Sequence, residues 1–475
     1  MPGSSKTTDF AIGPHPTGLT ITQWLYEEIR KAVLDGRLRR GAPIPPTRSI
    51  AIQHNVSRRI VVNVFDQLRD EGYLTALTGS GTRISENIPE DYLASSAARP
   101  PSRTTGGFSG QHARPFLPVQ PSLAEFQIDA WIRLESRTLR RASTLDLADA
   151  DPAGNPALRS AIAAHLGVSR GVSCSPDQIV ITSGTQQSLD LLARVLVRPN
   201  DRLWIEDPGY KDAAEIFRHA GARVVPVPVD DYGVNIPSPR GSPPRAIYVT
   251  PAHQFPLGVS LRLDRRLELL RWTRDRNVMV IEDDYDSEFR FAGRPIPAMK
   301  GLAGSSHVFL LGTFNKALFP TLRIGYIVAP DPWLDSLLRL RRLTERFPAA
   351  LPQRTLAAFI EEGHFARHLR RMRELYGARL TTLRTDIKRH LDGAVSLPEI
   401  KAGLNIPAFL DRSIDAATAA GRARADKLEV WTLDRFALAR RDLNGFLLGF
   451  APFTEREIHA AVLKLARAIE VPPAT

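Results

Sequence analysis

The sequence contains a single cysteine, Cys174, among its 475 residues. One thiol excludes an intramolecular disulfide framework, and without a neighbouring cysteine it cannot build a thiolate zinc site. The chain also lacks an apolar run of membrane-spanning length, and its first ten residues lack the hydrophobic segment of a signal peptide. These absences predict a protein of the reducing cytoplasm, with no membrane span and no metal site.

Positive charge is in excess: 63 lysines and arginines face 51 acidic residues, which gives a formal net charge of +12. A polyanionic partner is one explanation, although such a balance often reflects arginine-rich composition alone. The length exceeds what one hydrophobic core usually serves, so two or more domains are expected.

The first domain is predicted over residues 20–85. An apolar stripe at helical spacing predicts a first helix. Thr47 and Ser57 each stand where a side-chain oxygen can accept the first free amide hydrogens of a second and a third helix. Two short strands, at 73–75 and 82–84, flank a glycine-rich hairpin tip. The pattern predicts a winged helix-turn-helix.

This domain is basic, with ten lysines and arginines against six acids. Duplex DNA offers regularly spaced phosphates, and the N-terminus of a helix that carries arginines can enter the major groove. We therefore expect Arg58 and Arg59 to enter the groove and Arg48 to grip phosphate. The other expected contacts to double-stranded DNA come from Ser57, Asn63 and Gly81. A winged helix used only for protein contacts is the alternative.

The same segment resembles the GntR family of regulators. The run "LYEEIRKAVLDGRLRRGAPIPPTRSIAIQHNVSRRIVVNVFDQLRDEGYLTALTGSGTRI" matches the family pattern nearly throughout. Ile60 and Val61 stand where the family more often has a threonine and a valine, so one polar DNA contact is expected to be replaced by methyl contacts. The resemblance implies DNA binding.

Residues 86–116 are predicted to form a flexible linker, because they are small, polar and rich in proline and glycine.

The second domain is predicted over residues 117–472 as an α/β fold, since short β-branched runs alternate with helical patterns. The run 183–187 opens a helix whose free amide hydrogens suit a phosphate, although many helices begin with such residues. A buried strand at 278–282 leads into carboxylates, another at 310–312 leads to a lysine, and a third at 205–207 leads to a tyrosine. Together these strand ends predict one site.

Pyridoxal phosphate needs a lysine amine for an imine bond, a carboxylate for its ring nitrogen, an aromatic ring to stack on, and donors for its phosphate. Lys316 is predicted to form the imine, Asp283 to pair with the ring nitrogen, Tyr285 to hydrogen-bond the phenolic oxygen, and Tyr210 to stack. The residues predicted around the phosphate are Gly184, Thr185, Thr313, Asn315 and Arg323.

The runs "QIVITSGTQQSLDLLARVL", "IEDPGY", "VTPAHQFPLG", "IEDDYDSEFRF" and "GTFNKALFPTLRIGY" resemble the fold type I aminotransferase domain of MocR/GabR-type regulators. The resemblance implies a homodimeric transcription regulator whose aminotransferase-like domain is a sensor rather than an enzyme. Its effector would be an amine, an amino acid or pyridoxal phosphate itself. The alternatives are an active aminotransferase with a DNA-binding appendage and a regulator whose cofactor domain is vacant.

Five positions need comment against this family. Asn315 stands where a serine is usual, Asp149 where a tyrosine commonly reaches the partner subunit's phosphate, and Asp212 where the regulator responding to γ-aminobutyrate has an arginine. Arg435 resembles an arginine that holds the effector's carboxylate, with a surface arginine as the alternative. His253 lies in the motif that faces the cofactor's ring oxygen, with a structural histidine as the alternative.

Overall fold

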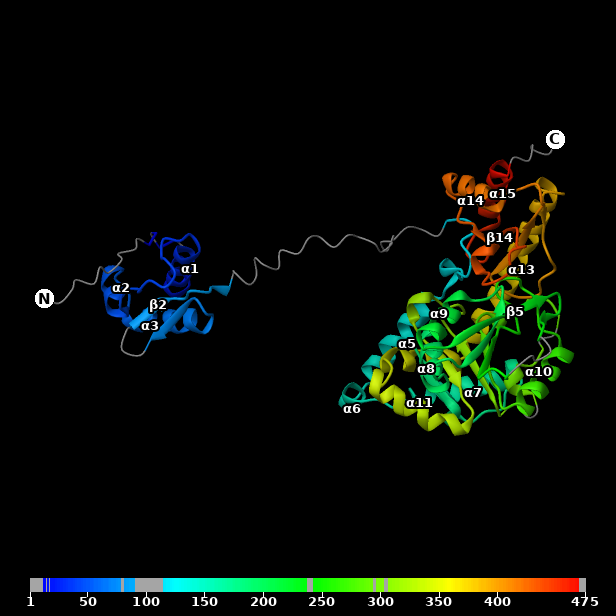
Figure 1. Cartoon of the computed structure of the whole chain (residues 1–475), viewed down its shortest axis with the longest axis horizontal. Coiled ribbons are helices and arrows are strands. Elements are labelled where there is room, and N and C mark those ends of the chain that lie inside the picture. Colours follow the sequence, from blue (N-terminus) through cyan, green and yellow to red (C-terminus); the bar gives the residue numbers. More distant parts are fainter. Residues whose placement is uncertain are drawn as a thin grey trace. The chain divides into compact units, whose positions relative to one another are not determined.

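The chain divides into two compact units, Met1–Gly110 and Gln111–Thr475 (Figure 1). This computed structural model describes residues 12–13, 15–16, 18–77, 81–89, 114–236, 242–293, 296–302 and 306–469. The division falls inside the predicted linker, most of which, residues 90–113, lies outside the described residues. No helix in the described ranges is long and apolar enough to cross a membrane.

The first unit contains the predicted winged helix-turn-helix. Its helices are α1 (Ile21–Leu34), α2 (Thr47–Gln53) and α3 (Arg58–Asp70). Strands β1 (Leu74–Leu77) and β2 (Gly81–Ile84) pair antiparallel, and the predicted hairpin tip at 78–80 lies outside the described residues. The helices enclose one apolar core, which includes Leu25 and Ile29 of α1 and Val64 and Phe65 of α3.

The two predicted helix caps of this unit have different outcomes. Ser57 caps α3, because its hydroxyl accepts the amide hydrogen of Ile60 at 3.3 Å. The prediction for Thr47 is wrong: α2 begins at Thr47, and Pro46, which has no side-chain acceptor, occupies the cap position. The Pro46 carbonyl accepts the amides of Ser49 and Ile50, so the helical hydrogen bonds start one residue earlier than expected.

The second unit is built on an eight-stranded mixed sheet with the strand order β3-β10-β9-β8-β7-β4-β5-β6. Neighbouring strands from β9 to β5 are parallel, as predicted, whereas β10 runs antiparallel to both of its neighbours and β6 antiparallel to β5. The strands are β3 (Ile179–Thr182), β4 (Arg202–Asp207), β5 (Arg223–Asp230), β6 (Gly233–Val234), β7 (Ala246–Val249), β8 (Met279–Asp284), β9 (Val308–Thr313) and β10 (Gly325–Val328).

Helices cover both faces of this sheet, because alternate residues of its strands point to opposite sides. Met279 and Ile281 of β8 belong to the apolar cluster under α8, α9 and α11, whereas Val280 belongs to the cluster under α10. The helices of this part of the unit are α5 (Ile128–Arg140), α6 (Thr144–Ala148), α7 (Pro156–Arg170), α8 (Thr185–Leu196), α9 (Lys211–His219), α10 (Leu263–Asp275), α11 (Asp331–Thr344) and α12 (Ala350–Glu361).

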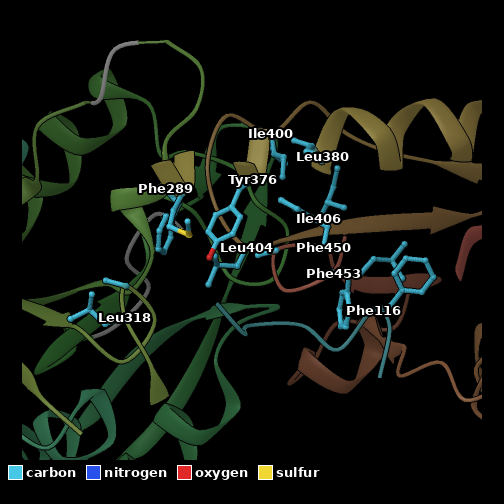
Figure 2. Packing of buried hydrophobic residues seen from close by; sticks show 14 of the residues in the cluster. Phe116, Phe289, Leu318, Tyr376, Leu380, Ile400, Leu404, Ile406, Phe450 and Phe453 are labelled. Carbon is cyan, nitrogen blue, oxygen red and sulfur yellow. The ribbon is translucent and has the colours of Figure 1, made fainter. Parts of the chain in front are cut away.

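A smaller antiparallel sheet follows near the C-terminus, with the strand order β11-β12-β14-β13. Its strands are β11 (Val395–Ser396), β12 (Asn405–Leu410), β13 (Trp431–Thr432) and β14 (Gly445–Gly449), and its helices are α13 (His364–His390), α14 (Ala416–Ala425) and α15 (Glu455–Ala468). One continuous core runs from Leu318 through Tyr376 of α13 to Ile406 of β12 (Figure 2). The small sheet is therefore packed into the same unit as the large one.

Candidate functional site

A cavity of about 630 Å³ lies where β4, β7, β8 and β9 end. These parallel strands all finish on the same side, which is where open α/β sheets place their ligands. Nine of the eleven residues that the sequence predicts for cofactor or effector line it: Thr185, Tyr210, Asp283, Tyr285, Thr313, Asn315, Lys316, Arg323 and Arg435. Of the other two, Gly184 directly precedes α8, and His253 lies behind the cavity wall.

Lys316 follows β9 and is mostly buried. Its Nζ donates a hydrogen bond to the Val119 carbonyl at 2.8 Å. Burial lowers the pKa of this amine to about 8, and the nearby charge of Asp286 partly opposes that change. A larger fraction of the amine is therefore neutral near physiological pH than in an exposed lysine, and the neutral amine is the nucleophile.

Asp283 lies next to the last residue of β8, and only one of its two carboxylate oxygens has a hydrogen-bond partner among the described residues. Its Oδ2 accepts the hydroxyl of Tyr248 at 2.7 Å, while its Oδ1 is buried and has no hydrogen-bond partner among the described residues. Burial raises the pKa of Asp283 to about 7, although the Tyr248 hydroxyl opposes the rise. An unpaired buried carboxylate oxygen is costly, so this atom is suited to a donor supplied by a ligand.

The start of α8 forms a cradle that only glycine fits. Gly184 has a φ of +123°, and a Cβ on it would lie 2.7 Å from Nδ2 of Asn315. The Asn315 Oδ1 accepts the Ile324 amide at 3.0 Å, and the hydroxyl of Thr313 accepts the Asn315 amide at 3.2 Å. The N-terminus of α8 thus begins close to Asn315 at the cavity wall, where the helix dipole favours an anion.

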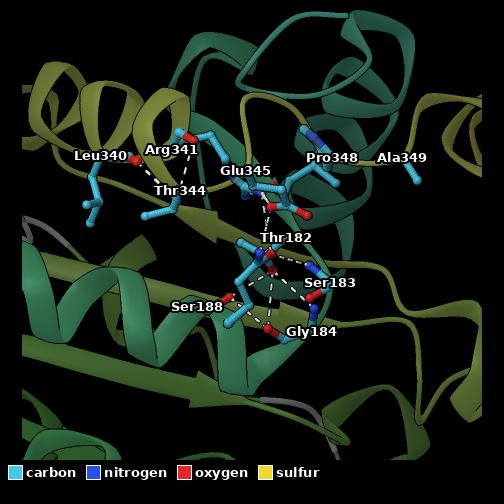
Figure 3. A network of polar contacts seen from close by, with 12 residues as sticks. Thr182, Ser183, Gly184, Ser188, Leu340, Arg341, Thr344, Glu345, Pro348 and Ala349 are labelled. Carbon is cyan, nitrogen blue, oxygen red and sulfur yellow. Dashed lines mark hydrogen bonds and ion pairs between the residues drawn. The ribbon is translucent and has the colours of Figure 1, made fainter. Parts of the chain in front are cut away.

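A polar network holds this helix start in place (Figure 3). The hydroxyls of Thr182 and Ser188 lie 2.9 Å apart, and the Ser183 amide donates to Oε1 of Gln187 at 2.7 Å. Arg341 of α11 donates to the Ile181 carbonyl and pairs with Glu345. The end of β3 and the first turn of α8 are therefore tied to each other and to α11.

Tyr285 is backed by a buried histidine. The hydroxyl of Tyr285 lies 3.1 Å from Nδ1 of His253, and that nitrogen lies 2.9 Å from a carboxylate oxygen of Asp286. The two rings stack with centroids 6.0 Å apart. His253 does not line the cavity, and Gly403 packs so closely that a Cβ there would lie 2.1 Å from the imidazole. This placement favours the structural role that the sequence left open.

Charged groups of both signs face the cavity. Arg435 stacks its guanidinium over the Trp431 ring at 4.5 Å. Asp212 accepts hydrogen bonds from the Tyr210 hydroxyl at 3.2 Å and from Gln186 at 3.3 Å. Arg323 sits in the left-handed backbone region with φ +52°. The wall therefore offers at least two cations and one carboxylate besides Lys316 and Asp283.

Asp149 lies outside the cavity. It is exposed, pairs with Arg346 at 3.6 Å and is not among the residues that line the cavity.

Sequence reasoning missed Tyr248 and Thr250, which both line the cavity. Thr250 donates its hydroxyl to the buried Glu206 at 2.6 Å, and burial raises the pKa of that carboxyl to about 7. Tyr248 lies within the apolar strand β7 and looks like a core residue in the sequence, so no local signal marked its hydroxyl.

The candidate DNA surface of the first unit is fully exposed. Arg58 and Arg59 begin α3, and neither forms an ion pair with a described residue. The inward face of α3 is apolar, as predicted, with Val61 and Leu68 buried. The six predicted DNA contacts, Arg48, Ser57, Arg58, Arg59, Asn63 and Gly81, are all exposed.

Two family models match the chain. Residues 122–404 match "Aminotransferase class I and II", and residues 21–84 match "Bacterial regulatory proteins, gntR family". Among curated relatives, the probable rhizopine catabolism regulatory protein MocR of Rhizobium meliloti is 38% identical over 91% of both chains. The pyridoxine biosynthesis regulator PdxR of Corynebacterium glutamicum is 32% identical over 97% of this chain and 98% of its own length.

Solved structures match the second unit. The α-aminoadipate aminotransferase LysN of Thermus thermophilus, complexed with N-(5'-phosphopyridoxyl)-L-leucine, has a TM-score of 0.69 and 26% identity. The match covers 75% of this chain and 92% of LysN. A kynurenine aminotransferase of Pyrococcus horikoshii has the same TM-score at 24% identity, which supports the fold alone. The predicted aminotransferase-like fold is therefore confirmed.

Proposed function

Because the chain belongs to the MocR/GabR-type branch of GntR-family transcription regulators, we propose that it binds operator DNA through residues 20–85 and senses an amine or amino acid through pyridoxal phosphate held at Lys316. One observation carries the proposal. A mostly buried amine and a buried carboxylate oxygen that has no hydrogen-bond partner among the described residues face one cavity, and helix α8 begins there with Thr185, directly after Gly184.

The residues present fit this cofactor. When bound, pyridoxal phosphate supplies an aldehyde that condenses reversibly with primary amines. Lys316 would hold it covalently, Asp283 would accept the ring N–H at its unpaired Oδ1, Tyr285 would face the phenolic oxygen, and Tyr210 would stack on the ring. The phosphate would be held by Gly184, Thr185, Thr313, Asn315 and Arg323.

Proton positions in the cavity follow from burial. Lys316 loses its proton near pH 8, so the neutral amine needed for bonding is available at little cost. Burial raises the pKa of Asp283 to about 7 when no cationic group lies beside its carboxylate. A protonated ring nitrogen would favour the carboxylate form of Asp283, whose second oxygen accepts the Tyr248 hydroxyl.

The effector is proposed to enter beside Arg435, whose guanidinium can pair with a carboxylate. Asp212 adds a negative charge to the same wall, which disfavours an effector whose second carboxylate would lie there. Exchange of the effector amine for the Lys316 amine would free Lys316 and shift the population of domain arrangements that bind DNA. Turnover is not required for this sensing role.

We also propose a homodimer. Five large apolar side chains on α5 and α6 are exposed, namely Ile128, Ile132, Leu139, Leu145 and Leu147, with Leu145 at 79% and Leu147 at 68%. Ile128 and Ile132 are each 52% exposed on α5. Several exposed large apolar side chains on two consecutive helices are typical of a protein interface, and a second copy of this chain is the partner that the family resemblance implies. Light scattering on purified protein measures the state, and a monomer at micromolar concentration contradicts the proposal.

The test of the sensing function uses visible absorbance and DNA binding together. The wild-type protein loaded with pyridoxal phosphate should absorb in the visible range, Lys316→Ala should not, and Lys211→Ala, which also changes a cavity lysine, should absorb like the wild type. Amines that change the spectrum should also change operator affinity. A wild type that stays colourless after loading contradicts the site.

An active aminotransferase is the rival function, because the fold is that of an enzyme. Steady-state turnover with an amine donor and a keto acid would separate the two. Sustained turnover, combined with operator affinity that no amine alters, would favour the enzyme. A regulator should show amine-dependent DNA binding with at most a single half-reaction per cofactor.

A further inference from the structure

Two helices of the C-terminal part bring together three metal-ligating side chains away from the cavity. Asp386 and His390 lie four residues apart on α13, and His459 lies on α15, which packs against α13 (Figure 1). One ligand atom from each of the three residues lies within 4.8 Å of the other two. None of the three lines the cofactor cavity.

The geometry of the cluster is close to what a small cation requires. Nδ1 of His459 is 3.2 Å from Oδ2 of Asp386. Tetrahedral ligands at about 2.0–2.1 Å from zinc lie roughly 3.3 Å apart, so this pair already has the required spacing. The ligand atom of His390 lies within 4.8 Å of the other two, so a shift of at most about 1.5 Å would bring it to the same spacing.

An ion pair between Asp386 and His459 explains only part of the cluster. The imidazole rings of His390 and His459 lie 5.8 Å apart, and Nε2 of His390 is buried without a hydrogen-bond partner in the part of the chain that the structure describes. Buried imidazole nitrogens are normally bonded, so this atom indicates a missing ligand. Asp386 is 11% exposed at its side chain and His459 is 48% exposed, so an ion can enter from solvent.

We propose that Asp386, His390 and His459 bind one divalent transition-metal ion of the zinc class. Imidazole nitrogen and carboxylate oxygen suit zinc, copper and nickel rather than calcium or magnesium, which prefer oxygen ligands alone. Three protein ligands leave a fourth position for water or another small ligand. The lone cysteine excluded a thiolate site from the start, and this site needs no thiolate.

The ion would tie α15 to the last turn of α13. Both helices already share an apolar seam that includes Leu383, Ile387 and Val462. The other end of α13 contacts the cofactor region, where Nε2 of His368 lies 3.0 Å from the carbonyl oxygen of Ala317, the residue after Lys316. The bound ion should raise the melting temperature of the second unit and leave the cofactor spectrum unchanged, because no ligand touches the cavity.

The test uses the tag-free full chain loaded with pyridoxal phosphate, stripped of metal with a chelator and titrated with zinc chloride against a chromophoric competitor. The wild type should take up one equivalent per chain, whereas His390→Ala and His459→Gln should not. His219→Ala is the matched control, because His219 is an exposed histidine on α9 whose Nδ1 bonds the Glu215 carbonyl of its own helix. This variant should bind zinc like the wild type.

Thermal unfolding gives a second readout that does not depend on one variant. Zinc should raise the melting temperature of the wild type and of His219→Ala but not that of His459→Gln, whose side chain is at the surface. No stoichiometric uptake by the wild type overturns the proposal, and so does equal uptake by His390→Ala and His459→Gln. Loss of uptake in His219→Ala would indicate scattered surface binding and would also overturn it.

Discussion

The two recognition regions of this chain place their charges in opposite environments. Arg58 and Arg59 stand exposed at the start of α3, and no described residue pairs with them. Lys316 and Asp283 are buried, and their pKa values move toward neutrality, to about 8 and about 7. Dissolved salt screens the attraction between an exposed arginine and a polyanion. A buried amine, by contrast, can bond its ligand only when the amine itself has lost its proton. Ligand binding by the first region should therefore depend on salt concentration, and ligand binding by the second region on pH.

The largest expected effect tests the salt-controlled region. Arg58→Ala combined with Arg59→Ala should weaken operator binding by about 2–6 kcal/mol, because each arginine that contacts bases contributes about 1–3 kcal/mol. Where an arginine also neutralises a phosphate, the slope of log affinity against log salt should fall by about one for each lost contact. Fluorescence anisotropy with operator DNA at several salt concentrations measures both quantities.

Arg69→Ala provides the control for this pair. Arg69 is also exposed on α3, but it lies at the other end of the helix and pairs with Asp66. Its replacement should leave operator affinity within the error of the wild type. If the double variant keeps wild-type affinity, the start of α3 is not the surface that reads the groove.

The next effect tests the pH-controlled region without cofactor. Asp283 titrates near pH 7 in the folded chain, against an ordinary pKa of 3.8, so the folded state binds more protons between about pH 4 and 7. The contribution of this carboxyl to stability is therefore present below pH 4 and is lost as the pH rises to 7. A shift of this size corresponds to at most about 4 kcal/mol. Asp283→Asn should flatten the pH dependence of urea unfolding in that window.

Some pH dependence should remain in this variant, because Glu206 is also raised to a pKa of about 7 and acts with the same sign. Loading with pyridoxal phosphate should flatten the wild-type curve, since the ring nitrogen supplies the missing partner of Asp283. Equal slopes for cofactor-free wild type and Asp283→Asn would show that Asp283 is not desolvated.

The sequence predicted the secondary structure of the first unit and the strand-end residues of the cavity, but not the contacts between distant segments. Periodicity and turn residues predicted three helices and two strands, and the structure has them. The strand ends that carry Tyr210, Asp283 and Lys316 were also visible, because each follows a short apolar run, and the parallel sheet brings them together. Local patterns were sufficient for these three strand ends, although the cap that they predicted at Thr47 was wrong.

Contacts between distant segments were not predictable in this way. Val119 accepts the Lys316 amine from 197 positions away, and Tyr248 reaches Asp283 across neighbouring strands. His253 sits in the expected motif, but only the packing of Gly403 and Asp286 shows that it stands behind the cavity wall. His459 joins Asp386 and His390 only because α15 packs on α13. A single sequence carries no signal for such pairs.

A smaller effect tests the space in the buried region. Gly184→Ala places a Cβ 2.7 Å from Nδ2 of Asn315 at a φ of +123°, so the loop or Asn315 must shift. We expect affinity for pyridoxal phosphate to fall at least about tenfold, or about 1.4 kcal/mol, measured by absorbance titration. Gly393→Ala also has a positive φ but meets nothing within 4 Å, so it should affect stability alone. Equal cofactor affinity in both variants would contradict the cradle.

The smallest effect separates two caps that look equivalent in the sequence. Ser57→Ala removes the acceptor for the Ile60 amide at the start of α3 and should cost about 1 kcal/mol of stability in the first unit, measured by thermal unfolding. Thr47→Ala should cost much less, because Thr47 is the first residue of α2 and its side chain caps nothing. Equal losses would restore the capping role of Thr47. Ser57 is also one of the predicted DNA contacts, so its variant should lose operator affinity as well, whereas Thr47→Ala should not.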